Sequence, residues 1–363
     1  MNSNNPIINV LIVDDSAVVR GLISKMISND PNVAVVDTVA NGLLAVKRVD
    51  KGDVDVVVLD IEMPVMDGLT ALPQILAKDP KIKVIIASTL TMKNAEISLR
   101  ALQAGAADYI TKPSSSREMT GGKDFQHELL EKIKNLAQGK FGRAPQPATA
   151  ANPKIIPSAE VVLRPKATIR SKPRILVVGS STGGPQALFT FFKGLNGKLP
   201  VPALVTQHMP PNFTKILAQH LTKSAGFPAD EGQDGEILRA GHIYVAPGDY
   251  HMQVEEVDAV KKITLNQGPP ENYCRPAVNP MLRSVAEHYG SNVLVVILTG
   301  MGYDGMKGGE NIVAAGGTII AQDEASSVVW GMPGAVASAG LCTAVLPIDD
   351  LAPYVAEFMD KGM

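Results

Sequence analysis

Short apolar segments alternate with amphipathic segments along the first third of the chain. Apolar, often β-branched runs predict five buried parallel strands, at 7–13, 33–36, 54–59, 84–87 and 108–111. Ser16 stands where the first intervening helix would begin and is a candidate helix cap. Alternation of this kind predicts a doubly wound α/β domain with a parallel, flavodoxin-like sheet.

The same rhythm resumes after residue 174 and predicts a second doubly wound parallel-sheet α/β domain. Its expected strands lie at 175–178, 203–206, 242–246, 293–298 and 318–321. Between the two, prolines recur among Ala, Thr, Lys and Arg, which is typical of an extended basic linker. The alternative is a segment that docks on one domain and transmits a signal. We therefore expect domains at 1–138 and 174–363, with a linker at 139–173.

Composition narrows the class of protein. A length of 363 residues fits two domains, and a net charge of −2 argues against a strongly basic nucleic-acid binder. The two cysteines, Cys274 and Cys342, form no CxxC pair, so a disulfide scaffold or a cysteine zinc site is not expected. Apolar runs are too short to span a bilayer, and the start lacks a signal-peptide pattern. We expect a cytoplasmic monomer that neither inserts into membranes nor binds nucleic acid.

Polar side chains follow four strands of the first predicted domain, at the sheet edge where such folds gather functional groups. They are Asp14, Asp15, Asp60, Ser88 and Lys112. Three carboxylates repel one another unless a cation compensates, and Mg²⁺ prefers oxygen ligands. With a lysine and a hydroxyl nearby, the set suits phosphoryl transfer. Each acid alone would be read as a turn residue, but their order along the strand ends favours a site.

The stretch from Leu59 to Gly68 and the tripeptide Thr111-Lys112-Pro113 resemble the motifs of the response-regulator receiver family over residues 7–135. The resemblance implies that Asp60 accepts a phosphoryl group from a histidine kinase. It further implies a set of supporting roles. Mg²⁺ would be held by Asp14, Asp15, Asp60 and the backbone carbonyl of Glu62, the phosphate would be bonded by Ser88 beside Lys112, and Tyr109 would be the switch aromatic.

The second predicted domain begins with a G-x-S-x-G turn between a strand and a helix. Small neighbours at Gly179 and Gly183 let the turn project the hydroxyl of Ser181. A turn of this composition also cradles phosphates, so the motif alone leaves a nucleophile and an anion-binding loop open.

Two possible partners favour the nucleophile. His208 directly follows a predicted central strand and is a candidate general base. Asp304 lies in a glycine-rich loop after another strand and is a candidate for orienting the imidazole. The order serine, histidine, aspartate differs from that of the α/β-hydrolases, so that family is not a match. The charges at 255–256 and 261–262 predict the solvated face of a hairpin.

A second resemblance covers residues 174–360. The motifs around Ser181, the tetrapeptide Gln207–Pro210, the loop 298–305 and the segment Trp330–Pro333 look like those of the chemotaxis protein-glutamate methylesterase catalytic domain. The family implies that Ser181 is the nucleophile, His208 the base and Asp304 the orienting acid. Backbone amides near Thr182 and Met301 would form the oxyanion hole. Cys274 stands where many members carry histidine, and as a nucleophile it is disfavoured because no His–Cys context surrounds it.

Together these features predict a phosphorylation-activated serine esterase of chemotactic adaptation. It would hydrolyse glutamate methyl esters on methyl-accepting chemoreceptors, release methanol and also deamidate receptor glutamines. A chemotaxis histidine kinase would donate the phosphate, and the esterase itself would need no cofactor. We expect the unphosphorylated receiver to cover the esterase mouth. The alternatives are a phosphorylation-switched binding module without catalysis and a DNA-binding regulator, for which we see no basic stripe outside the linker.

Overall fold

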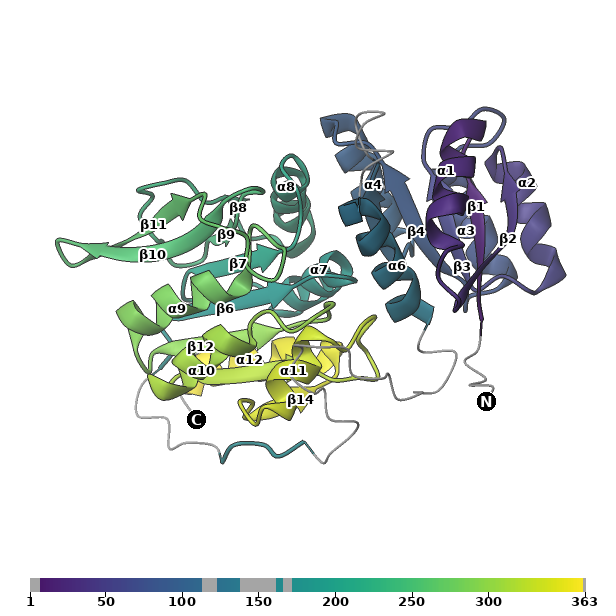
Figure 1. Cartoon of the computed structure of the whole chain (residues 1–363). Helices are drawn as coiled ribbons and strands as arrows, with labels where there is room; N and C mark the ends of the chain where they lie inside the picture. Colours follow the sequence, from purple (N-terminus) through teal and green to yellow (C-terminus); the bar gives the residue numbers. More distant parts are fainter. Residues whose placement is uncertain (1–6, 113–122, 138–160, 166–171, 362–363) are drawn as a thin grey trace. The chain divides into compact units, whose positions relative to one another are not determined.

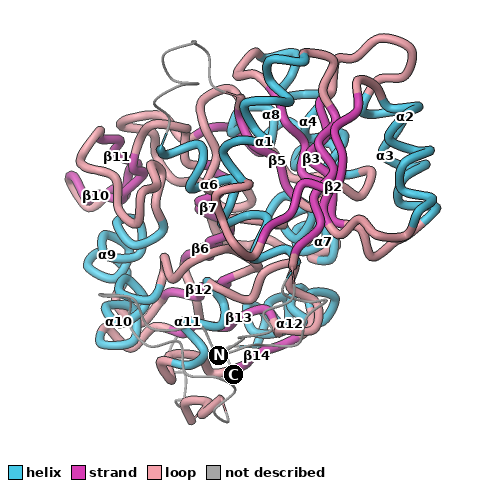
Figure 2. Tube along the Cα trace, turned by 45° about the vertical axis from the view of Figure 1, so that its right-hand side comes forward, coloured by secondary structure: helices cyan, strands magenta, loops and turns pink. Residues whose placement is uncertain are grey.

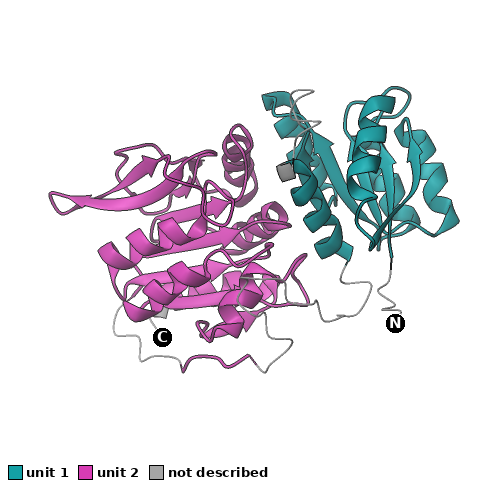
Figure 3. Cartoon of the chain, viewed as in Figure 1, with its two compact units in different colours: residues 1–147 teal, residues 148–363 magenta. Residues whose placement is uncertain are grey.

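A computed structural model describes residues 7–112, 123–137, 161–165 and 172–361. The chain falls into two compact units, residues 1–147 and 148–363, coloured separately in Figure 3. None of the described helices is both long and apolar enough to cross a membrane.

The first unit is built on a five-stranded parallel sheet of order β2-β1-β3-β4-β5. The strands are β1 (Ile8–Val13), β2 (Val33–Val39), β3 (Val56–Asp60), β4 (Lys83–Ser88) and β5 (Asp108–Thr111). The helices are α1 (Ala17–Ile27), α2 (Gly42–Arg48), the 3₁₀ turn η1 (Val49–Lys51), α3 (Gly68–Lys78), α4 (Met92–Gln103) and α6 (Lys123–Ala137). Figure 2 shows helices on both sides of these strands, so the predicted doubly wound fold is confirmed. Ser16 caps α1 by accepting a hydrogen bond from Val19 N, as predicted.

The second unit contains a seven-stranded parallel sheet of order β14-β13-β12-β6-β7-β9-β8 (Figure 1). Its strands are β6 (Ile175–Ser180), β7 (Ala203–Gln207), β8 (Ala229–Glu231), β9 (Ile243–Val245), β12 (Val293–Ile297), β13 (Thr318–Gln322) and β14 (Ala344–Leu346). Its helices are α7 (Gly184–Gly194), α8 (Phe213–Ala225), α9 (Val278–Tyr289), α10 (Met306–Ala314), α11 (Met332–Ser338) and α12 (Ile348–Lys361). The central strands β6, β7 and β12 are buried on both faces, which explains their continuous apolar sequences.

An antiparallel hairpin of β10 (His251–Val257) and β11 (Val260–Asn266) lies outside this sheet. Across it Glu255 opposes Lys262 and Glu256 opposes Lys261, so the predicted hairpin is confirmed. Neighbouring residues of a strand point to opposite faces, so the two charged pairs do not share the single face that was predicted. The face that carries Glu256 and Lys261 also buries apolar side chains, such as Met252 and Ile263, in the core of the unit.

Most of the predicted linker, residues 139–173, lies outside the described residues, and its boundaries stay a prediction. The described piece 161–165 belongs to the second unit. There Arg164 N donates a hydrogen bond to Cys342 O at 2.8 Å, and Val161 packs against the hydrophobic core.

Candidate functional site

The acidic residues predicted at the strand ends of the first unit meet in one place. Ligand oxygens of Asp14, Asp15 and Asp60 all lie within 4.8 Å of one another. Asp14 and Asp60 are buried, while Asp15 is exposed. Three carboxylates with one open side fit the oxygen-rich, partly hydrated coordination that Mg²⁺ prefers.

Lys112 lies between the two buried carboxylates. Its Nζ is 2.6 Å from Asp14 Oδ2 and 2.7 Å from Asp60 Oδ1. Burial raises the pKa of Asp60, and Lys112 only partly opposes the shift. Burial alone would lower the pKa of Lys112, but the two acids outweigh it and raise the pKa. The ammonium therefore stays charged and compensates the acidic cluster.

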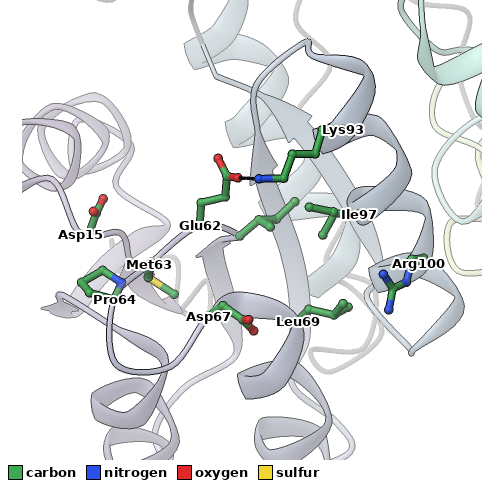
Figure 4. Close-up of a pocket in the computed structure, with 10 residues that line it drawn as sticks. Asp15, Glu62, Met63, Pro64, Asp67, Leu69, Lys93, Ile97 and Arg100 are labelled. Atoms are coloured by element: carbon green, nitrogen blue, oxygen red, sulfur yellow. Dashed lines mark hydrogen bonds and ion pairs between the residues drawn. The ribbon is translucent and has the colours of Figure 1, made fainter.

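The other predicted residues surround this cluster. Ser88 is buried at the end of β4, with its hydroxyl within 3.4 Å of Asn94 O, and Tyr109 is buried on β5. The Glu62 side chain points toward Lys93 and pairs with it at 2.6 Å (Figure 4). This pair and Asp15 line a cavity of about 490 Å³.

In the second unit, Ser181 directly follows β6 and precedes α7. Its backbone N–H donates to Thr299 O at 3.1 Å, which ties the turn to the end of β12. Gly183 has a φ of +74°, a left-handed conformation that glycine adopts without strain. Ser180 is fully buried and its hydroxyl donates to Gln207 Oε1 at 2.7 Å, whereas Ser181 is half-buried. Of the two serines, only Ser181 is partly exposed, and its hydroxyl does not donate to Gln207 as that of Ser180 does.

Gln207 also holds the carbonyl side of this turn. Its Nε2 donates to Ser181 O at 2.9 Å. Because β6 and β7 pair with Ser180 opposite Gln207, the next residues, Ser181 and His208, leave the sheet side by side. Gln207 belongs to the tetrapeptide 207–210, but the sequence pattern predicted no role for it.

His208 and Asp304 are in direct contact. His208 Nε2 lies 2.8 Å from Asp304 Oδ2, and the two side chains are 11% and 1% exposed. In neutral imidazole one nitrogen donates and the other accepts, so a carboxylate partner assigns the proton to Nε2 and leaves Nδ1 as the base. Within the described part of the chain, no hydrogen bond joins the Ser181 hydroxyl to His208. The predicted triad is thus joined in one of its two contacts.

Asp304 is cradled by the first turn of α9. Val278 N donates to Oδ2 at 2.6 Å and Asn279 N donates to Oδ1 at 3.1 Å. The Asn272 side chain adds a third donor at 3.2 Å. Although burial alone would raise the pKa of Asp304, the hydrogen bonds from His208 and these amides lower it. The carboxylate therefore stays ionised and orients the imidazole.

Two further contacts were not predicted. Asn279 Oδ1 accepts hydrogen bonds from the backbone N–H groups of Gly305 and Gly308, at 3.0 and 2.8 Å, and so braces the Asp304 loop. Cys274 Sγ lies 3.3 Å from His208 Nδ1. The interpretation that no histidine accompanies Cys274 is wrong, because the 66 residues that separate the two positions hide a contact made only in the fold.

The residues expected to form an oxyanion hole lie on either side of Ser181. Thr182 follows it directly and is buried. Met301 follows Gly300, and a Cβ placed on Gly300 would lie only 2.9 Å from Ser181 Cβ. Their roles stay a prediction.

Comparison with known proteins defines the class first. A family model described as a response regulator receiver domain matches residues 10–121, and one described as CheB methylesterase matches residues 176–355. The chain is therefore a receiver joined to a methylesterase domain.

Whole-chain relatives define the family. Over 98% of its length the chain is 54% identical to protein-glutamate methylesterase/protein-glutamine glutaminase 1 of Rhodospirillum rubrum, covering 96% of that protein. It is 50% identical to the enzyme of that name from Azospirillum brasilense, over 98% of this chain and 93% of the other. The crystal structure of the Thermotoga maritima CheB methylesterase catalytic domain matches 52% of the chain and 100% of that domain, with a TM-score of 0.50 and 40% identity. The chain belongs to the protein-glutamate methylesterase/protein-glutamine glutaminase family.

Proposed function

We propose that this protein hydrolyses glutamate methyl esters on methyl-accepting chemoreceptors, releases methanol, and deamidates receptor glutamines at the same site. The observation that carries the proposal is the hydrogen bond between His208 and Asp304 beside Ser181. An ionised carboxylate fixes the imidazole tautomer and leaves Nδ1 as the nitrogen that can accept the proton of the serine.

In this mechanism His208 Nδ1 accepts the proton as Ser181 Oγ attacks the side-chain carbonyl carbon of the substrate. The negative charge on the tetrahedral oxygen would be stabilised by amides near Thr182 and Met301, at the N-terminal end of α7. His208 then gives its proton to the methoxide oxygen, or to the amide nitrogen when the substrate is glutamine, as the bond to the carbonyl carbon breaks, so that methanol or ammonia departs. Water, activated by the same base, hydrolyses the acyl-enzyme and leaves a glutamate.

Two serine variants test this reaction in the full-length chain. Ser181→Ala should lose methanol release by about 10³-fold or more and should not be labelled by a fluorophosphonate. Ser180→Ala is the neighbouring control, because its hydroxyl is buried against Gln207; it should still be labelled and active. Wild-type methanol release from Ser181→Ala would refute the assignment.

Regulation would begin at Asp60. Asp14, Asp15, Asp60 and the Glu62 carbonyl would hold Mg²⁺, which supplies charge neutralisation for the incoming phosphate. Lys112 and Ser88 would contact that phosphate, and Tyr109 would be the aromatic side chain that switches when the phosphate is bound. A chemotaxis histidine kinase is the proposed donor, and relief of receiver occlusion is the proposed consequence. With acetyl phosphate and Mg²⁺ the wild-type rate should rise, whereas Asp60→Asn should stay at its basal rate; activation of Asp60→Asn would contradict this proposal.

A further inference from the structure

The residues that precede α9 form a tight turn that is fixed on several sides. Glu271 and Cys274 exchange two backbone hydrogen bonds, at 3.1 and 2.9 Å. Arg283 of α9 pairs with the Glu271 carboxylate, and Asn272 donates to Asp304. The next residue, Arg275, is held by Asp249 through its Nε at 3.0 Å. These contacts fix the backbone from which the Cys274 side chain projects.

That side chain reaches the nitrogen on which the proposed reaction depends. Asp304 takes Nε2 of His208, so Nδ1 must accept the proton of the nucleophile. Cys274 Sγ lies 3.3 Å from Nδ1, within reach of an S–H donor. Cys274 is half-buried, so reagents can reach it from solvent, whereas Cys342 is fully buried.

We propose that Cys274 is a positioning residue for His208, holding Nδ1 beside the serine turn, and that covalent modification of its sulfur by a soft electrophile stops the esterase. The proposal rests on the proposed function, because it assigns Nδ1 as the base for Ser181. In the resting enzyme one proton is held between Cys274 Sγ and His208 Nδ1, and this contact keeps the ring in place. During catalysis Nδ1 is released to the Ser181 hydroxyl, because a neutral imidazole nitrogen has a single lone pair.

The charges around the imidazole support this arrangement. The titratable groups that face it are Asp304 and Cys274, and Arg283 acts on Asp304 from α9. Although burial alone lowers the pKa of His208, its contacts with Cys274 and with the Asp304 carboxylate raise it to about 10. Removal of the sulfur should therefore lower the pKa of the base.

Alkylation by iodoacetamide is a balanced step at this site. His208 Nδ1 accepts the thiol proton, the sulfur attacks the methylene carbon, an S–C bond forms, and the C–I bond breaks to release iodide. The bulky thioether then occupies the space beside Nδ1. Burial raises the pKa of Cys342 to about 12, so this second thiol should stay unmodified.

The experiment treats the full-length protein with iodoacetamide, maps the modified cysteine by mass spectrometry, and measures methanol release. Wild type and the control Cys342→Ala should carry the label on Cys274 and lose activity by about 10²-fold or more, as expected for a blocked base. Cys274→Ser should resist the reagent. Equal inactivation of wild type and Cys274→Ser, or a label on Cys342 alone, would overturn the proposal.

Untreated variants test the positioning role. Cys274→Ala should lower kcat by about 2-fold to 10-fold with little change in KM, the size expected for one lost hydrogen bond. The ascending limb of the kcat-versus-pH profile of Cys274→Ala should move to lower pH by about 1 to 3 units. Cys274→Ser should restore kcat, because a hydroxyl can also donate to Nδ1. An unshifted pH limb in Cys274→Ala would overturn the positioning role.

Activity measurements on Ser181→Ala and Cys274→Ser distinguish a failure of this proposal from a failure of the proposed function. Activity in Ser181→Ala together with none in Cys274→Ser would make Cys274 the nucleophile and would refute both ideas. Activity in Ser181→Ala with Cys274→Ser also active would refute the nucleophile assignment alone, since the labelled cysteine is mapped without reference to turnover.

Discussion

Gly300→Ala tests the position of Ser181 without replacing any residue of the proposed triad. Gly300 lies beside the serine turn, and an added Cβ would be 2.9 Å from Ser181 Cβ and 2.4 Å from Met332 Sδ. Ordinary contacts begin at 3.4 Å, so the serine must move by about 0.5 Å even if Met332 finds another rotamer. Gly300 does not require a positive φ, so alanine adds crowding and no backbone strain.

The size of the effect follows from this displacement. A misplacement of about 1 Å can cost about 10²-fold in rate, so about half of it should cost about 10-fold in kcat. KM should change little, because the displaced hydroxyl acts in the transition state. Overpacking should lower the free energy of unfolding by about 1 to 3 kcal/mol.

Methanol release from methylated receptor measures kcat, and thermal unfolding confirms that the variant is folded. Gly309→Ala is the matched control. Gly309 lies on α10, where a Cβ would meet only the ends of the Ile319 and Leu341 side chains, at 3.1 and 3.3 Å. A folded Gly300→Ala enzyme with wild-type kcat, or an equal loss in Gly309→Ala, would refute the reasoning.

Three further changes should alter stability in defined ways. Asn279→Ala leaves two buried amides of the Asp304 loop without an acceptor and should lower the free energy of unfolding by about 2 to 6 kcal/mol in urea titrations. Lys112→Met leaves two buried carboxylates uncompensated and should destabilise the receiver by about 3 kcal/mol, with partial recovery when Mg²⁺ is added; equal loss with and without Mg²⁺ would contradict the assigned metal site. The His208 contact helps to lower the pKa of Asp304 in the folded protein. The resulting contribution of Asp304 to the free energy of unfolding should be complete above pH 3.8 and be lost as the pH falls through the pKa of the folded state. Urea midpoints over a pH series should show this loss in wild type and not in Asp304→Asn.

The fold was largely predictable because parallel strands covered by helices on both faces need continuous apolar sequences. Strand β12 carries this signal over its whole length, and β6 and β7 carry it up to their last two residues. Strands β8 and β14 do not, since each has three residues, and β8 includes the charged Asp230 and Glu231. Edge strands of this size are selected by their neighbours in the sheet and leave little trace in the local pattern.

The residues of the candidate site also fall into those that the sequence pattern predicts and those that it does not. Ser181 and His208 follow strands directly, so the sheet register alone brings them together. Cys274, Asn272 and Asn279 reach the site through a turn and a helix start, and no periodic pattern encodes the path of that turn. A polar residue at the end of a buried strand could be predicted; a side chain delivered by a loop could not.

The order of strands explains why the sequence order of the proposed triad is unusual. In the sheet, β6 lies between β7 and β12; the chain runs from β6 to β7 on one side and from β12 to β13 on the other, so the connections after β6 and β12 run in opposite directions. Such a switch point opens a crevice in doubly wound sheets. Ser181 follows the middle strand, His208 follows one neighbour, and Asp304 follows the loop after the other. The three side chains can therefore meet whichever neighbouring strand the chain forms first, and the reaction depends on this lateral order and not on the order of the residues in the sequence.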